Sequence, residues 1–164
     1  MAASSLRRAF ETGATFGLTS GVITTLGLIV GLHSGTHSRP VIVGGIITIA
    51  IADAFSDALG MHLHEESEND HTGAEIWAST FATLITKFLM AGTFLIPVLL
   101  VEFPRAISMS LLWGAVVLTA LSYQLARSQG QRPLKVIAEH LAIAALVVLI
   151  THAVGDWVGT RLAS

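Results

Sequence analysis

Long apolar runs alternate with short polar separators along the whole chain. Each run is long enough to cross about 30 Å of hydrocarbon as a helix. The separators are rich in glycine, proline and charged residues, which end helices. The runs cover residues 13–32, 41–61, 76–101, 106–126 and 136–158. The pattern predicts an all-α integral membrane protein with about five transmembrane helices, in a single domain over residues 1–164.

Composition agrees with this class and excludes several others. Hydrophobic residues make up 52% of the chain, charged residues only 12%, and the mean hydropathy is +0.71, which an ordinary soluble domain does not show. A net charge of −2 provides no large basic field, so we expect no nucleic-acid partner. The absence of cysteine excludes disulfides, thiolate metal sites and cysteine nucleophiles.

Lysine and arginine near the ends of the runs predict the orientation. Cytoplasmic segments carry an excess of these residues. The side that holds the N-terminus has Arg7, Arg8, Arg127, Arg132 and Lys135, whereas the opposite side has Arg39, Arg105 and Arg161. We therefore expect a cytoplasmic N-terminus and a non-cytoplasmic C-terminus.

The first run carries regularly spaced glycines, which let helix backbones approach closely in lipid. They are Gly13, Gly17, Gly21, Gly27 and Gly31. Simple packing between helices explains them fully. The functional alternative is that this face is the seam of a homodimer.

The second run is the most informative, because Asp53 and Asp57 interrupt it. A charged aspartate in the middle of the membrane costs about 2.5–3.5 kcal/mol on insertion scales. The spacing of four residues puts both carboxylates on one helix face, and Met61 and His64 continue the same stripe.

Two structural interpretations compete with a functional one. Lys87 in the third run can pair with one aspartate, or an aspartate can be protonated in its apolar surroundings. A single pair uses only one of the two acids. For the other, a cation or proton path is the default hypothesis for an acid inside the membrane.

Residues 62–75, expected to form an acidic cytoplasmic loop, follow the aspartate stripe directly. They contain five carboxylates and three imidazoles, a mixture that suits Mn, Fe(II), Zn or Ni. A solvated acidic loop has the same composition. The position beside the aspartates makes His64, Glu65 and Glu66 candidate metal ligands.

Further polar groups lie near the ends of the fifth run and of the first. They are Glu139 and His140 on the cytoplasmic side, and His152, Asp156, His33 and His37 on the far side. The far-side group can be an exit site or a set of interfacial residues that reach water. The sequence has no nucleotide-binding loop, nucleophile elbow or HExxH motif, so we expect neither an ATP-driven pump nor an enzyme.

Two segments and several further positions resemble the vacuolar iron transporter family, including its yeast-type iron/manganese members. Residues 16–31 resemble the family's first helix almost continuously, and residues 52–67 resemble the second. Gly92, Ile96-Pro97 and Gly155 also fit, and the resemblance covers residues 13–159.

The chain departs from the family pattern at three positions. The Asp-Gly of the first helix is Ser20-Gly21 here, the methionine of the second helix is Asp57, and the glutamate that follows is Met61. A carboxylate lost from the first helix is therefore matched by one gained in the second. The long glutamate-rich cytoplasmic region of the plant members is reduced to residues 62–75.

The resemblance implies a homodimer in the plasma membrane or a vacuole-like membrane, surrounded by lipid and joined through the first helix. It implies export of Fe(II) or Mn(II) from the cytoplasm in exchange for protons, with the metal as substrate and no cofactor. The expected metal-binding residues are Asp53, Asp57, Met61, His64, Glu65 and Glu66, with a weak oxygen contact from Ser20. The alternatives are a proton or small-cation permease, a non-transporting membrane scaffold and, more weakly, a membrane metalloenzyme.

Overall fold

The computed structural model of the chain describes residues 2–68, 70–103 and 105–161. These residues form helices and contain no strand. The helices are α1 (Ala2–Thr36), α2 (Arg39–Ser67), α3 (Gly73–Thr93), α4 (Leu95–Leu100), α5 (Arg105–Ser128) and α6 (Pro133–Arg161).

Five segments of the described chain are long and apolar enough to span a membrane, which confirms the predicted fold class. The third span, Gly73–Leu100, contains both α3 and α4, because the helix breaks at Phe94. Pro97 has no backbone N–H to bond the carbonyl of Thr93, which is the ordinary cause of such a break. The sequence pattern had predicted one uninterrupted helix there.

The acidic loop predicted over residues 62–75 is wrong for most of its length. Helix α2 continues through Ser67, and α3 already begins at Gly73. A capping box starts α3, in which the Glu75 side chain accepts a hydrogen bond from the backbone N–H of Thr72 at 2.7 Å. Hydropathy indicates where a helix leaves the hydrocarbon, whereas hydrogen bonds and caps decide where the helix ends.

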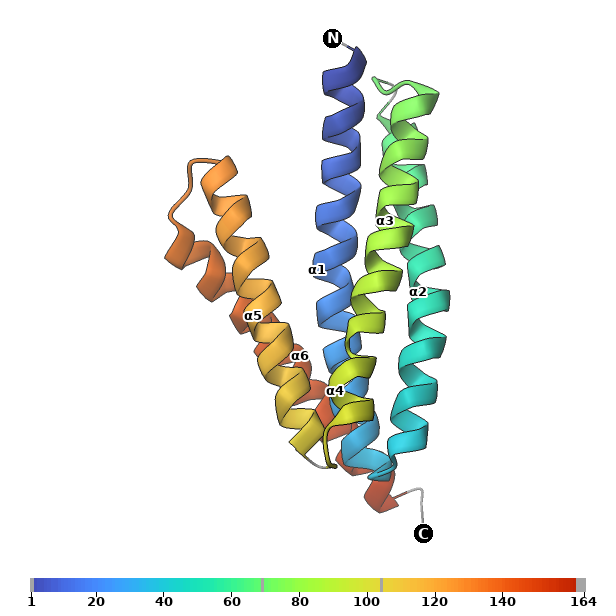
Figure 1. Cartoon of the computed structure of the whole chain (residues 1–164), viewed down its shortest axis with the longest axis vertical. Helices are drawn as coiled ribbons and strands as arrows, with labels where there is room; N and C mark the ends of the chain where they lie inside the picture. Colours follow the sequence, from blue (N-terminus) through green and yellow to red (C-terminus); the bar gives the residue numbers. More distant parts are fainter. Residues whose placement is uncertain (1, 69, 104, 162–164) are drawn as a thin grey trace.

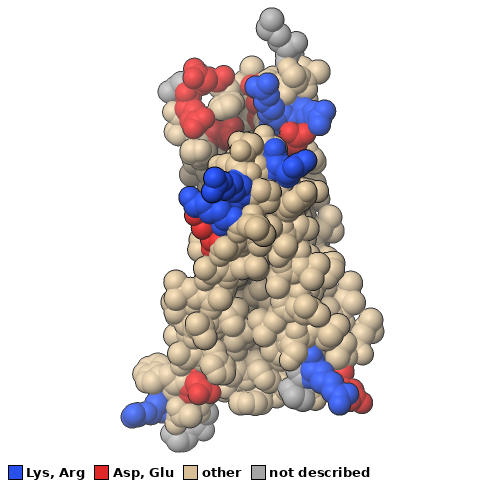
Figure 2. Space-filling model, turned by 90° about the vertical axis from the view of Figure 1, so that its left-hand side faces the viewer, with Lys and Arg blue, Asp and Glu red and all other residues tan. Residues whose placement is uncertain are grey.

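Helix α1 is the centre of the bundle and contacts α2, α3, α5 and α6. The hairpin of α5 and α6 meets α1 near the C-terminal end of the bundle and diverges from it toward the N-terminal end (Figure 1). The N-terminus and the α2–α3 connection lie at one end, and the C-terminus and the α1–α2 connection lie at the other. Figure 2 shows charged side chains toward both ends of one face, with an uncharged band between them.

The glycines of α1 pack within the chain. A Cβ atom at Gly17 would lie 2.6 Å from the carbonyl oxygen of Thr83 on α3. A Cβ at Gly31 would lie 3.3 Å from the carbonyl oxygen of Thr151 on α6. The glycine face therefore serves helix packing, the simpler of its two interpretations, and a homodimer seam would need a different face of α1.

Candidate functional site

Four polar side chains meet near the middle of three membrane spans. Lys87 of α3 is fully buried, and its Nζ lies 2.6 Å from Asp53 Oδ2 on α2. The same ammonium pairs with Asp57 and donates a hydrogen bond to Ser20 Oγ of α1 at 2.9 Å. Ser20 in turn donates to Asp57 Oδ2 at 2.7 Å. We call these four residues the lysine–aspartate cluster.

Local sequence explains why the cluster forms. Asp53 and Asp57 lie one turn apart on α2, and the short connection from Glu68 to Thr72 returns the chain so that α3 packs against α2. Gly21 lets α1 approach α3 closely, because a Cβ there would lie 3.3 Å from the carbonyl oxygen of Lys87. This approach places Ser20 within hydrogen-bond distance of the ammonium.

The charges of the cluster do not cancel, since one ammonium faces two carboxylates. When all three groups are charged, the cluster keeps one net negative charge. The interpretation that Lys87 pairs with a single aspartate is wrong in this detail, because it contacts both. A lone charge would be costly here, and the paired arrangement explains how three ionisable groups are tolerated inside the membrane.

The carboxylates are more accessible than the lysine. The side chains of Asp53 and Asp57 are 27% and 21% exposed, whereas that of Lys87 is 2% exposed. Asp53 lines a groove of about 630 Å³ between α1 and α2, together with Thr48 and Ser56. The cluster thus presents the Asp53 carboxylate to the groove, whereas the Lys87 ammonium is buried.

The other two members of the predicted stripe have different surroundings. Met61 is buried at 8% exposure, one turn beyond Asp57 on α2. His64 is on the surface, with its Nε2 3.6 Å from Glu68 Oε1. The stripe therefore continues as far as Met61 and does not include His64.

A second polar group occupies the end of the bundle where α2 and α3 are joined. Glu65 is buried, and its Oε2 lies 3.5 Å from His71 Nε2. The same His71 nitrogen lies 3.1 Å from Glu68 Oε2, and hydrogen bonding to Glu68 raises the pKa of His71. Glu66 is exposed. We call Glu65, Glu68 and His71 the acidic-end triad.

Sequence reasoning had named Glu65 but missed the roles of Glu68 and His71. Their spacing of three residues is a local signal for contact, although the chain turn between them hides it. Within the described residues, no group of three or more histidine, aspartate or glutamate side chains has an arrangement that could hold a metal ion. The predicted ligands are instead divided between the lysine–aspartate cluster and the acidic end.

One comparison with known proteins found a family match. Residues 12–80 match the model of the VIT family. This match supports membership in the vacuolar iron transporter family. The matched segment contains most of α1, all of α2 and the first turns of α3, and so it includes Ser20 and both aspartates of the cluster. No curated protein and no solved structure matches the chain.

The match to the VIT family agrees with the resemblance seen in the sequence, and it suggests metal-ion transport. Members of the family are transporters, which fits a protein that is not an enzyme. The five apolar helices and the family together indicate an integral membrane protein.

Proposed function

We propose that this protein carries a divalent transition-metal cation, Fe(II) or Mn(II), out of the cytoplasm in exchange for protons. The observation that carries the proposal is the pair of partly exposed carboxylates within the membrane spans, of which Asp53 lines the groove between α1 and α2. Sites for substrate and coupling ion in transporters lie near the middle of the bilayer, where this pair also lies. The VIT family match supplies the class of cargo.

Asp53 and Asp57 are the proposed ligands of the cation in transit. Their oxygens suit hard divalent ions, and the nearby Met61 thioether favours a softer transition metal over Mg or Ca. Ser20 contributes a weak oxygen contact. Because a carboxylate must be deprotonated to bind a metal, arrival of the cation releases any proton held there, and this couples the two fluxes at one site.

Before the metal ion binds, the Lys87 ammonium occupies the place beside the two carboxylates that the metal ion would take. Its ammonium contacts both carboxylates, so a metal ion must compete with it. With Lys87 charged, one chain retains a single negative charge. Two chains whose α1–α2 grooves face each other would retain two, which one divalent ion neutralises. Charge balance therefore favours the homodimer that the family resemblance implies.

The acidic end is the proposed collecting site on the cytoplasmic side. His64 and Glu66 are exposed there, and Glu65 is buried beside His71. Glu65 Oε2 makes no hydrogen bond in the described structure, so it has capacity for another partner. Imidazole and carboxylate together favour Fe(II) or Mn(II) over alkali cations.

A proton or small-cation permease is the second candidate. The observation in its favour is the ammonium of Lys87, which already neutralises one of the two carboxylates. The remaining negative charge can be neutralised by one monovalent cation. A non-transporting scaffold, in which these ions only pair with one another, would show no flux of any kind.

The test reconstitutes the purified protein in liposomes and measures the uptake of Fe(II), Mn(II), Zn(II), Co(II) and Ca(II). Each ion is tested with and without a pH gradient. We expect Fe(II) or Mn(II) flux that depends on the gradient and disappears in Asp53→Asn with Asp57→Asn. Glu102→Gln is the matched control, because Glu102 has an 87% exposed side chain at the opposite end of the bundle. Proton flux without metal flux would support the permease, and no flux would support the scaffold.

A further inference from the structure

The connection between α5 and α6 carries an excess of positive charge. Arg127, Arg132 and Lys135 lie close together in the sequence, which contains no aspartate or glutamate between Glu102 and Glu139. All three basic side chains are exposed. Figure 2 views the molecule from the side of the α5–α6 hairpin and shows lysine and arginine gathered toward one end of this face. The proposed transport path uses none of these residues.

A closed backbone turn holds the tip of this hairpin. The backbone N–H of Gln131 donates to the carbonyl of Ala126 at 2.9 Å. The N–H of Gly130 donates to the carbonyl of Arg127 at 3.4 Å. Gly130 has a φ of 66°, a conformation that glycine adopts readily, and the two bonds together form the Schellman motif that ends many helices. Arg127 and Arg132 therefore extend from a fixed backbone.

The two arginines of this turn lack a partner on the protein. In the part of the chain that the structure describes, neither the Arg127 nor the Arg132 side chain forms an ion pair or a hydrogen bond. Lys135 Nζ lies 3.7 Å from Glu139 Oε1, and both of these side chains are exposed. Most of the positive charge at the turn is therefore free to bind an external anion.

Two arginines at the opposite end of the bundle have partners within the chain. Arg39 donates to the carbonyl of Val101 at 2.7 Å and lies over the ring of Phe103. Arg105 Nη1 lies 3.8 Å from Glu102 Oε2. The chain supplies partners for these two guanidinium groups, whereas it supplies none for the two arginines of the α5–α6 turn.

An apolar groove of about 510 Å³ leads along α5 to the same turn. It is lined by Ala115, Val116, Thr119, Ala120 and Tyr123 of α5 and by Ile137 of α6. Ala115 to Tyr123 covers about 12 Å of helix, close to one leaflet's share of a hydrocarbon core about 30 Å thick. Tyr123 lies one turn before Arg127, so the groove ends beside the basic turn.

We propose that the groove and the basic turn bind one anionic phospholipid. An acyl chain lies in the groove, and the headgroup phosphate lies against Arg127 and Arg132. Basic groups at the cytoplasmic ends of membrane helices are typical sites for anionic headgroups, and the orientation predicted from the sequence puts this turn on that side. Charge also favours a lipid over a second copy of the chain, because a two-fold dimer through this face would bring two basic turns together.

The proposal is independent of the proposed function, since the site includes no residue of the lysine–aspartate cluster or of the acidic end. The test is native mass spectrometry of the full-length protein in detergent, titrated with phosphatidylglycerol or with phosphatidylcholine of identical acyl chains. We expect the wild type to bind phosphatidylglycerol more tightly. Arg127→Gln with Arg132→Gln should weaken phosphatidylglycerol binding about tenfold or more and leave phosphatidylcholine binding unchanged. Thermal unfolding checks that this variant keeps its fold.

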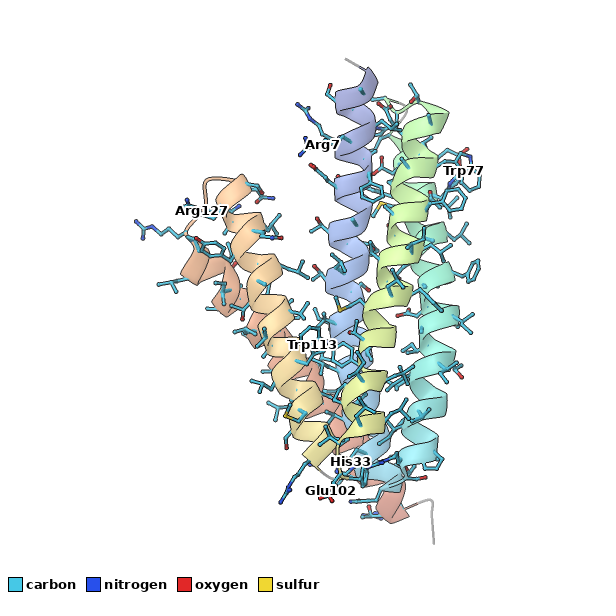
Figure 3. The ribbon with its side chains drawn as sticks, in the orientation of Figure 1. Arg7, His33, Trp77, Glu102, Trp113 and Arg127 are labelled. Atoms are coloured by element: carbon cyan, nitrogen blue, oxygen red, sulfur yellow. The ribbon has the colours of Figure 1, made fainter. Side chains whose placement is uncertain are left out.

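The matched charge control is Arg7→Gln with Arg8→Gln. It removes the same charge from α1, where Arg7 lies apart from Arg127 at the hairpin (Figure 3). This control should keep the wild-type preference for phosphatidylglycerol. Equal affinity of the wild type for the two lipids would overturn the proposal. An equal loss in the control would also overturn it, because only the general surface charge would then matter.

A second variant tests the groove without changing any charge. Ala120→Leu places a larger side chain in the groove and should weaken the binding of both lipids. Ala142→Leu is its matched control, because Ala142 is exposed on α6 and does not line the groove. The same spectra report the oligomeric state. If Ala120→Leu lost a dimer but kept its lipid affinity, the groove would bind a second copy and the proposal would be wrong.

Discussion

Lys87 Nζ and Asp53 Oδ2 lie 2.6 Å apart near the middle of their two membrane-spanning helices, and the same ammonium also pairs with Asp57. The lysine thus has two anionic partners. Removing one of them leaves the other in place, so neither aspartate alone is needed to keep the buried ammonium paired. Because one aspartate can be replaced without leaving Lys87 unpaired, the effect of that replacement on transport can be measured apart from its effect on stability.

Asp57→Asn should therefore fold and insert normally and lose metal flux. Asparagine preserves the shape and can still bond to Ser20, whereas it cannot carry charge or exchange a proton. The measurements are thermal unfolding in detergent and metal uptake by liposomes. A loss of about 3–5 kcal/mol in stability would instead mean that Asp57 is the essential partner of a buried charge.

Lys87→Met should destabilise the protein by several kcal/mol at neutral pH, roughly the cost of leaving two adjacent carboxylates without a cation. Adding Asp57→Asn to Lys87→Met should restore part of this stability without restoring flux. Unfolding and uptake are measured on the same preparations. If the double variant recovered both, the carboxylate of Asp57 would have no transport role.

Gly17→Ala should destabilise the protein by about 1–3 kcal/mol, because the new methyl group would meet the backbone of Thr83 at 2.6 Å. Gly44→Ala is the matched control on α2, since a Cβ there has no atom within 4 Å. Denaturant unfolding in detergent compares the two. If Gly17→Ala kept normal stability but shifted the protein from dimer to monomer, Gly17 would instead lie at a subunit interface.

The acidic-end triad should make stability fall as the pH rises. Hydrogen bonding to Glu68 raises the pKa of His71 above 6.5, so the folded protein favours the charged imidazole. The resulting stabilisation is present below pH 6.5 and is lost as the pH rises through the folded pKa. Glu68→Gln should lower the His71 pKa toward 6.5 in an NMR titration, whereas an unchanged value would show that Glu68 has no part in it.

Single cysteines placed before and after α6 should label from opposite sides of the membrane, because α6 is a membrane span. The natural chain has no cysteine, so Gln131→Cys and Arg161→Cys each introduce one exposed thiol. We expect an impermeant maleimide to reach position 161 in intact cells and position 131 only after permeabilisation. The reverse pattern would invert the predicted orientation, and labelling of both positions in intact cells would contradict a membrane-spanning α6.

The number of spans could be predicted from the sequence because burial in lipid selects for apolar residues regardless of neighbours. The ends of the helices could not, since residues 62–67 are polar and still helical. Hydropathy indicates whether lipid or water surrounds a helix, whereas the capping box of Thr72 with Glu75 marks where α3 begins. That second signal was present in the sequence and decides where α3 begins.

The partners of the candidate site were only partly predictable. The i, i+4 spacing of the aspartates identified a shared face, and Lys87 was the obvious cation. Pairing with both acids depends on how closely α1, α2 and α3 approach, which a linear pattern does not contain. The same limit applies to the glycines of α1, whose spacing predicts a close neighbour without specifying which helix it is.

The short connection between α2 and α3 has a consequence for biosynthesis. Helix α2 leaves the ribosome before α3, with two acids that each resist entry into lipid by about 2.5–3.5 kcal/mol. Their cation is Lys87 on α3, which lies 30 residues after Asp57 and follows a short link from Glu68 to Thr72. We therefore expect the insertion machinery to hold α2 at its lateral gate until α3 has emerged, so that the two helices enter the bilayer as one hairpin.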